Sequence, residues 1–251
     1  MRLHRFIIKD PELLHQWREV LRLRAGEQVV LADGAGTEVR AEIKTLAKDH
    51  AELEPLGELT TKPESGRQVT LYCAVLKSDH FELVAQKATE IGVTAIQPII
   101  TIRTVKTSLR LGRLEKIIKK AAEQSSRTTL PQISEPMSFE EAISEASKHE
   151  QNYFLDPATE QNFKTIKAHD VAIWIGPEGG WTAEELAKSK EFAKAVSISP
   201  FVLRAETAAI VASYLTLHAW LYFYFLKTVA GVYVKIELIR DGIWKEYAKF
   251  K

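Results

Sequence analysis

The sequence predicts an α/β fold built on a parallel sheet, preceded by a smaller part rich in strands. After about residue 68, short apolar runs alternate with stretches of helical length, the pattern of a parallel sheet covered by helices. Before that point the apolar runs are short and joined by turns, and residues 60–66 have the Thr, Pro, Ser and Gly content of a linker. A chain of 251 residues can hold two such parts.

The first part is expected to contain one helix and several short strands. An amphipathic pattern predicts the helix at residues 11–24. Strands are expected at residues 3–8, 28–32, 37–44 and 51–56. Asp33-Gly34-Ala35-Gly36 joins the second and third of these strands as a hairpin turn. Together these elements suggest a small β-barrel.

The second part is expected to alternate strand and helix. Strands are predicted at residues 69–76, 94–100, 153–155, 171–175 and 195–198. Helices are predicted at residues 79–91, 111–125, 184–193 and 206–226. Parallel α/β sheets bind ligands beyond the carboxyl ends of their strands. Three segments follow such ends, namely residues 156–157, 176–180 and 199–204.

The segment IGPEGGWTAEEL, residues 175–186, connects an expected buried strand to an expected helix. Thr182, followed three residues later by Glu, forms a capping box, and Trp181 and Leu186 occupy the positions of a hydrophobic staple. The loop lacks the Lys-Ser/Thr of a P-loop and the spacing of a dinucleotide fingerprint, and Glu178 would repel a phosphate. The loop therefore either binds something other than a nucleotide phosphate or is only a tight turn.

Composition excludes several classes of protein. Lys and Arg total 34 and Asp and Glu total 33, so global charge identifies no partner. The single cysteine, Cys73, excludes an intramolecular disulfide and fits a reducing compartment, and its apolar surroundings favour core packing over catalysis. The N-terminus is too short and charged for a signal peptide, and no Cys/His/Asp cluster has metal spacing. We expect a soluble cytoplasmic protein without a membrane segment or a metal site.

Charge is uneven along the chain despite the neutral total. Residues 100–130 carry eight basic side chains against two acidic ones. Such a segment is either a phosphate-binding surface or the solvated face of a helix. The basic side chains are Arg103, Lys106, Arg110, Arg113, Lys116, Lys119, Lys120 and Arg127.

Four motifs, in their order and spacing, give the chain a family resemblance. They are QKATEIGV at residues 86–93, AAEQSSR at 121–127, IGPEGG at 175–180 and VLRAETA at 202–208. Over roughly residues 1–220 the chain resembles the RsmE family, the 16S ribosomal RNA uridine-N3 methyltransferases of the SPOUT class. The pair of IGPEGG with LRAETA is the most specific part of this match.

The resemblance implies a fold and an activity. It implies a PUA-like RNA-binding β-barrel at residues 1–67 and a SPOUT methyltransferase domain with a trefoil knot at residues 68–226, while residues 227–251 have no assigned role. It further implies a homodimer that methylates N3 of a uridine in 16S ribosomal RNA, within the small ribosomal subunit, using S-adenosylmethionine. The alternatives are a SPOUT enzyme that acts on another RNA and a catalytically weakened RNA-binding homologue.

The resemblance also implies the site residues. S-adenosylmethionine carries a sulfonium cation and no phosphate, so it suits the loop, where Glu178 either contacts it or braces the knot. Arg204 is the candidate catalytic residue, because a positioned Arg can stabilise the charge of a deprotonated uridine. The alternative is that Arg204 pairs with Glu206 or caps a helix. The expected cofactor-binding residues are Leu155, Ile175, Gly176, Gly179, Gly180, Ile198, Ser199, Leu203 and Thr207. The expected RNA-binding residues are Arg2, Arg5, Arg103, Lys106 and Arg127.

Some residues depart from the family pattern or fall outside it. Ser126 and Ser199 stand where the family usually has Gly, and Phe201 removes a possible RNA contact. No histidine falls in a motif, so no general base is assigned and His80 is expected to serve packing or the surface. Small residues at 207–213 predict that this helix packs in or beside a dimer interface. Arg103 and Arg127 are expected nearest the catalytic pocket.

Overall fold

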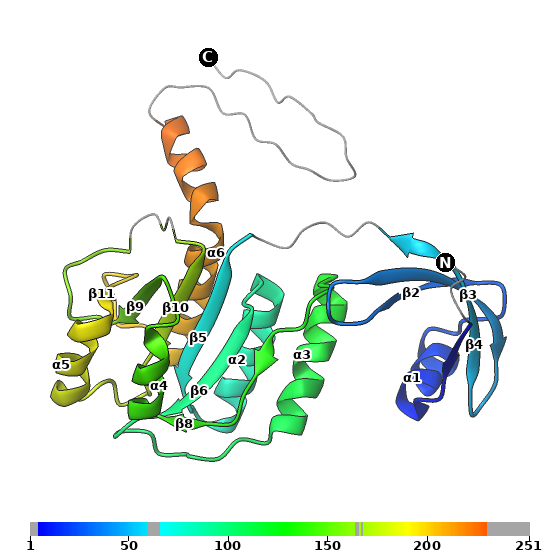
Figure 1. The fold of residues 1–251 in the computed structure, drawn as a ribbon, viewed down its shortest axis with the longest axis horizontal. Coiled ribbons are helices and arrows are strands. Elements are labelled where there is room, and N and C mark those ends of the chain that lie inside the picture. The colour runs from blue at the N-terminus through cyan, green and yellow to red at the C-terminus, as the bar shows by residue number, and fades with distance from the viewer. Residues whose placement is uncertain (1–4, 60–65, 164–165, 167, 230–251) are drawn as a thin grey trace.

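The computed structural model describes residues 5–59, 66–163, 166 and 168–229, without the side chains of Ser78 and residues 219–229. These residues form two separate sheets, a small antiparallel one and a large parallel one (Figure 1). Arg2 and most of the expected linker and C-terminal extension lie outside the described residues.

The small sheet is antiparallel and packs against a short helix. Its strand order is β1-β4-β3-β2. The elements are β1 (Phe6–Ile8), α1 (Pro11–His15), a π-helical turn (Gln16–Val20), β2 (Gln28–Ala32), β3 (Glu38–Leu46) and β4 (Ala51–Leu59). Leu14 and Trp17 of the helical segment bury themselves against Ile43 and Leu53 of the sheet. The helix expected at residues 11–24 ends early, because Arg22 adopts a left-handed φ of 55° that breaks a right-handed helix.

The large sheet is parallel throughout, as the alternating pattern predicts. Its order is β11-β9-β10-β5-β6-β7, and β8 also pairs with β6. The strands are β5 (Gln68–Ala74), β6 (Ala95–Ile100), β7 (Gln132–Ile133), β8 (Met137–Ser138), β9 (Gln151–Leu155), β10 (Asp170–Ile175) and β11 (Lys194–Val196). The central strand β10 is buried on both faces, which explains its unbroken apolar sequence.

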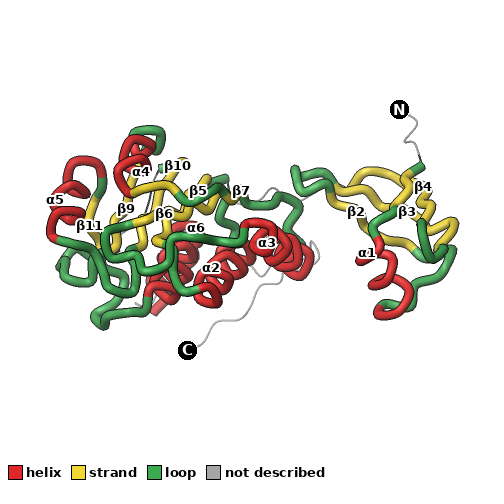
Figure 2. Tube along the Cα trace, turned by 90° about the horizontal axis from the view of Figure 1, so that it is seen from below, coloured by secondary structure: helices red, strands yellow, loops and turns green. Residues whose placement is uncertain are grey.

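Helices cover both faces of this sheet (Figure 2). One face carries α2 (Ser78–Ile91), α3 (Leu111–Ser125) and α6 (Ala205–Val229). The other carries α4 (Phe139–Ala146) and α5 (Ala183–Phe192). Each face has its own apolar core, and Trp174 anchors the second by stacking on Tyr72 with ring centroids 4.1 Å apart. Helix α4 was not predicted from the sequence.

The segment between β9 and β10 folds back along the start of the crossover into α6. The amide of Phe163 donates to the carbonyl of Ser197 at 3.0 Å, and the amide of Ser197 donates to the carbonyl of Gln161 at 2.8 Å. Arg67 fixes the same segment by donating to the carbonyls of Ala168 and Ile166, at 2.9 and 2.8 Å. The trefoil knot that the resemblance implies here stays a prediction.

The small residues of α6 pack inside the chain. Ala209, Ala212 and Ser213 are fully buried, and α6 contacts α2 and the sheet. Part of the close approach that these residues allow is therefore between elements of one chain, and the expectation that the helix packs in or beside a dimer interface stays a prediction. Within the described part of the chain, no helix has both the length and the apolar character needed to cross a membrane.

Glu185 connects the start of α5 to the loop after β6. The predicted capping box with Thr182 is present, with Glu185 accepting from the Thr182 amide at 2.8 Å and the Thr182 hydroxyl at 2.9 Å. Its other oxygen accepts from the amide of Ile102 at 2.9 Å, and the residue is only 2% exposed. This buried carboxylate is fully occupied by backbone and hydroxyl donors.

Replacing Glu185 with Ala is expected to lower the free energy of unfolding by about 3 kcal/mol, because buried donors lose a charged acceptor. Chemical denaturation measures this loss. Glu184→Ala is the matched control, since Glu184 pairs with Lys188 at the surface and such pairs contribute below about 1 kcal/mol. Equal losses in the two variants would contradict the bracing role of Glu185.

Candidate functional site

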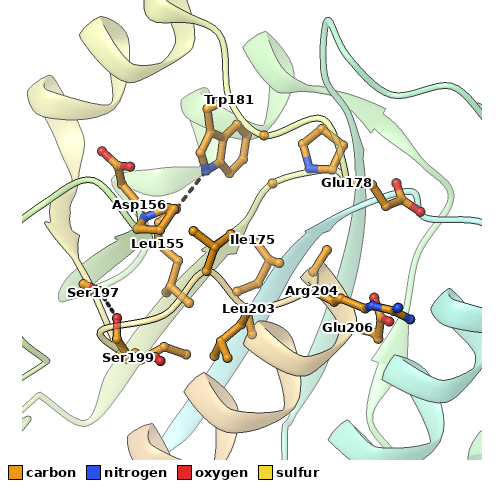
Figure 3. Close-up of a pocket in the computed structure, with 18 of the residues that line it drawn as sticks. Leu155, Asp156, Ile175, Glu178, Trp181, Ser197, Ser199, Leu203, Arg204 and Glu206 are labelled. Atoms are coloured by element: carbon orange, nitrogen blue, oxygen red, sulfur yellow. Dashed lines mark hydrogen bonds between the residues drawn. The ribbon is translucent and has the colours of Figure 1, made fainter.

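A cavity of about 570 Å³ opens at the carboxyl ends of β9, β10 and β11. This is the edge of the sheet where ligands of parallel α/β folds bind. The starts of α2 and α6 complete its wall. Figure 3 shows Glu178, Arg204 and Glu206 on one side of the cavity and Leu155, Asp156 and Ser199 on the opposite side.

The structure brings most of the expected cofactor residues together. The lining includes Leu155, Ile175, Gly176, Gly180, Ile198, Ser199 and Leu203. Two expected residues, Gly179 and Thr207, do not line it, and their part in cofactor binding stays a prediction. Gly179 is exposed and turned toward Arg103, whose guanidinium donates to the Gly179 carbonyl at 2.8 Å. Thr207 is exposed on α6 and is not among the residues that line the cavity.

Gly176 and Trp181 fix the shape of the glycine loop. The indole of Trp181 donates to the carbonyl of Leu155 at 2.9 Å and packs against Phe154 at a tilt, with ring centroids 4.2 Å apart. A Cβ atom on Gly176 would lie 2.9 Å from the Trp181 ring, so only glycine admits the indole here. The cavity wall thus depends on one close approach between backbone and aromatic ring.

Ser199 is accommodated where the family usually has glycine. Its φ is not in the left-handed region, so the backbone here does not require glycine. The Ser199 hydroxyl accepts from the amide of Phe201 at 3.0 Å, and its carbonyl accepts from the Ser197 hydroxyl at 3.0 Å. These bonds hold the loop as a turn and leave the Phe201 ring 76% exposed at the cavity.

Glu178 braces α2 from the glycine loop. Its carboxylate accepts from the backbone amide of Lys77, at the start of α2, at 3.2 Å. Such a contact satisfies one of the amides that a helix N-terminus leaves free. Glu178 also lines the cavity, so bracing does not remove it from the site.

His80 and Glu206 are site residues that the sequence analysis missed. His80 lies in the first turn of α2 and Glu206 in the first turn of α6, and both line the cavity. His80 Nδ1 is 3.8 Å from Glu206 Oε2 and 3.9 Å from Glu178 Oε1. The signal was available, because residues 75–80 follow the carboxyl end of β5 just as the three chosen segments follow theirs.

Arg204 stands at the N-cap of α6, where its carbonyl accepts from the amide of Ala208 at 2.8 Å. The residue is exposed and lines the cavity. Among the described residues its side chain forms no hydrogen bond or ion pair, so the alternative pairing with Glu206 is absent. Its guanidinium is therefore available to a ligand.

Cys73 lies beneath this site, and its thiol is unreactive. It is fully buried, and burial raises the pKa of its thiol, with the negative charges of Glu178 and Glu206 raising it further. A thiol in this state is not a thiolate nucleophile. The expectation of core packing for Cys73 is confirmed.

The expected RNA-binding residues are spread over the molecule. Arg5 is exposed beside β1, and Lys106 is half-buried in the loop between β6 and α3. Arg103 lies beside the glycine loop, donating to the carbonyls of Gly179 and Trp181 at 2.8 and 3.1 Å. Its place near the cavity is as expected.

Arg127 lies at the opposite end of the sheet, and its expected place near the pocket is wrong. Its guanidinium donates to the carbonyls of Thr89 and Val93, both at 2.9 Å, around the C-terminus of α2. A helix C-terminus leaves carbonyls without partners, and a cationic donor satisfies them.

Ser126 ends α3 with a φ of 55°, the conformation for which glycine is usual.

The cavity suits S-adenosylmethionine by its shape and chemistry. Its volume is within the range of small-molecule sites, and its walls combine apolar side chains with glycine backbone. A cationic sulfonium is compatible with the acidic side, where Glu206 Oε2 is buried without a hydrogen-bond partner in the described structure. No group of three His, Cys, Asp or Glu side chains in the described residues is placed to hold a metal ion.

Comparison with known proteins agrees with this architecture. A family model described as the RNA methyltransferase domain matches residues 63–217, and one described as the RNA methyltransferase PUA domain matches residues 19–56. A Neisseria gonorrhoeae ribosomal RNA small subunit methyltransferase E, crystallised with S-adenosyl methionine, superposes with a TM-score of 0.78 at 31% identity. The match covers 85% of this chain and 91% of that one. The fold and the cavity define an RNA methyltransferase of the SPOUT class.

Two sequence relatives give the family. Ribosomal RNA small subunit methyltransferase E of Synechocystis sp. is 35% identical, with 79% of this chain and 68% of that protein covered. The protein of that name from Rickettsia conorii is 32% identical, with coverages of 79% and 84%. The chain belongs to the family of ribosomal RNA small subunit methyltransferase E.

Proposed function

We propose that this protein transfers a methyl group from S-adenosylmethionine to N3 of a uridine in 16S ribosomal RNA. The observation that carries the proposal is the cavity itself. There Arg204, which has no partner among the described residues, lies close in sequence to the buried acid Glu206 at the carboxyl ends of the strands. The solved relative from Neisseria gonorrhoeae, with its bound S-adenosyl methionine, supports the choice of donor.

Each side of the cavity has a distinct role in this proposal. The donor supplies an electrophilic methyl group. Leu155, Ile175 and Leu203 offer apolar walls and the glycine loop offers backbone for binding it. Arg204 faces the oxygens on which negative charge develops as uridine N3 becomes a nucleophile. The lining must also hold N3 about 3–3.5 Å from the methyl carbon and in line with the breaking bond.

The RNA footprint is proposed to run along α3 toward the small sheet. Lys116, Lys119 and Lys120 are exposed on α3, and Lys116 lies 3.8 Å from Glu12 of α1. Arg5 adds charge on the small sheet, and Arg103 and Lys106 extend the footprint toward the cavity. Phosphate contacts of this kind supply affinity without sequence selectivity.

The division of labour follows from these positions. Residues 1–67 are proposed to help bind RNA, and residues 68–226 to bind the donor and transfer the methyl group. The active form is proposed to be a homodimer that works in the cytoplasm on the small ribosomal subunit. The backbone at Ser199 does not depend on glycine, which supports an active enzyme over the alternative of a weakened homologue.

The test is methylation followed by nucleoside mapping. Purified protein is incubated with S-adenosylmethionine and either assembled small subunits or naked 16S ribosomal RNA, and the digested RNA is examined by mass spectrometry. N3-methyluridine is the expected product, and large-subunit RNA is the control substrate. A different methylated nucleoside would support another target, and donor binding by calorimetry without any methylation would support the weakened homologue.

A further inference from the structure

We propose that Glu206 is the general base that removes the N3 proton of the uridine, and that His80 is the positioning residue through which this proton reaches solvent. The proposal rests on the uridine methylation proposed above. It concerns the acid–histidine cluster of Glu206, His80 and Glu178 on one side of the cavity.

Glu206 has the position that a base requires. The residue is 8% exposed and lines the cavity, and its Oε2 is buried without a hydrogen-bond partner in the described part of the chain. Buried polar atoms are nearly always hydrogen-bonded, so an orphaned carboxylate oxygen at a ligand cavity calls for a ligand partner.

His80 connects this carboxylate to the exterior. Its Nδ1 is also buried without a hydrogen-bond partner and lies 3.8 Å from Glu206 Oε2. Its side chain is 31% exposed, and Nε2 faces Asp79 Oδ2 at 3.9 Å. Distances between catalytic groups are often long before substrate binds, so this separation suits a contact that tightens in the complex.

Other groups nearby are poorly suited to act as the base. Glu178 is already held by the amide of Lys77. The Cys73 thiol is fully buried and has no open path to a substrate. Arg204 is a cation and cannot accept a proton. Its proposed role is to stabilise the negative charge that develops on the uridine. The charged groups that face the pair are Lys77, Asp79, Glu178 and Arg204.

The proton and electron balance is complete with the two substrates. The N3–H bond breaks as the proton passes to Glu206 Oε2. The freed N3 electron pair forms the bond to the methyl carbon, whose bond to sulfur breaks with its electron pair remaining on sulfur. The sulfonium charge is thereby cancelled. The proton then moves from Glu206 to His80 Nδ1, while Nε2 releases a proton to solvent.

The experiment compares RNA transcribed with uridine against RNA transcribed with 5-fluorouridine. Fluorine withdraws electrons and makes the N3 proton more acidic, so it reduces the need for a base. Glu206→Gln is expected to lower kcat about 10²–10⁴-fold on uridine RNA and to recover about tenfold on the fluorinated RNA. The ratio of the two rates is internal to each variant, so it does not depend on how much of the protein is folded.

Three further readings separate a base from a structural or binding residue. Calorimetry should show that Glu206→Gln still binds the donor, so that kcat is compared at saturating donor, and its kcat should keep rising with pH where that of the wild type is flat. Added imidazole should restore part of the turnover of His80→Ala but none of that of Glu206→Gln. Glu178→Gln is the matched carboxylate control and should show no fluorine-dependent recovery.

The outcomes distinguish this proposal from the one on which it rests. A wild-type protein that forms no N3-methyluridine on either RNA would overturn both the proposed methylation and the role of Glu206. Active wild type with the same defect of Glu206→Gln on both RNAs, or with no defect, would overturn the assignment of Glu206 and leave the methylation intact. Lack of imidazole recovery in His80→Ala would overturn the part assigned to His80.

Discussion

Gly176→Ala is expected to weaken the binding of S-adenosylmethionine about 100-fold, or about 3 kcal/mol. The new methyl group would lie 2.9 Å from the ring of Trp181. That indole is only 8% exposed and is held by Phe154, so it cannot move aside without breaking its bond to the Leu155 carbonyl. Leu155 and Trp181 both line the cavity, and its shape changes with them. Titration calorimetry measures the affinity.

Two other glycines serve as controls for this result. Gly179→Ala lies in the same loop, but its new atom would meet Arg103 at an ordinary 3.4 Å and outside the cavity. Gly112→Ala, in α3, would meet nothing within 4 Å. Both are expected to bind the donor like the wild type. If Gly179→Ala lost as much affinity as Gly176→Ala, the binding surface would be on the outer side of the loop instead.

Arg204→Met is expected to lower kcat about 10²–10³-fold, the usual loss when one donor to a developing negative charge is removed. The side chain has no partner to lose within the described structure, so the fold should be unaffected. Single-turnover methylation at saturating donor and RNA isolates this step from binding.

Arg204→Lys provides the matched variant, since it keeps the charge and loses the planar fork of donors. It should be intermediate between the wild type and Arg204→Met. A raised KM for RNA with unchanged kcat in Arg204→Met would show that Arg204 only binds phosphate. The catalytic role would then pass to another cation of the cavity wall.

Much of the second sheet could be predicted because its strands are continuous apolar runs. The expected strand at residues 171–175 and helix at 111–125 agree with β10 and α3 almost to the residue. The Thr182 capping box was predictable because it depends on residues three apart. The missed helix α4 has its own capping box at Ser138, but it is only 8 residues long.

The candidate site was only partly predictable because it is assembled from distant segments. Motifs indicated the glycine loop and Arg204. The place of His80 after the carboxyl end of β5 was a signal for this edge of the sheet, but no residue near His80 indicates that α2 begins beside α6. The same limit explains Arg127, whose partners Thr89 and Val93 are 38 and 34 residues away in sequence. Charge alone could not separate a guanidinium that caps a helix from one that faces solvent.

The hydrogen bond from Arg67 to the Ala168 carbonyl has a consequence for the order in which the two sheets fold during synthesis. The two residues are 101 positions apart, and β5 is separated from its neighbour β10 by about the same length of chain. The small sheet pairs strands that follow each other closely, so it can form while the ribosome is still translating the rest. The large sheet must close long loops first, which slows folding. A nascent chain can pair β5 with β6 early, but the other edge of β5 stays unpaired until β10 has been made, and this edge is where chaperone capture or aggregation would begin.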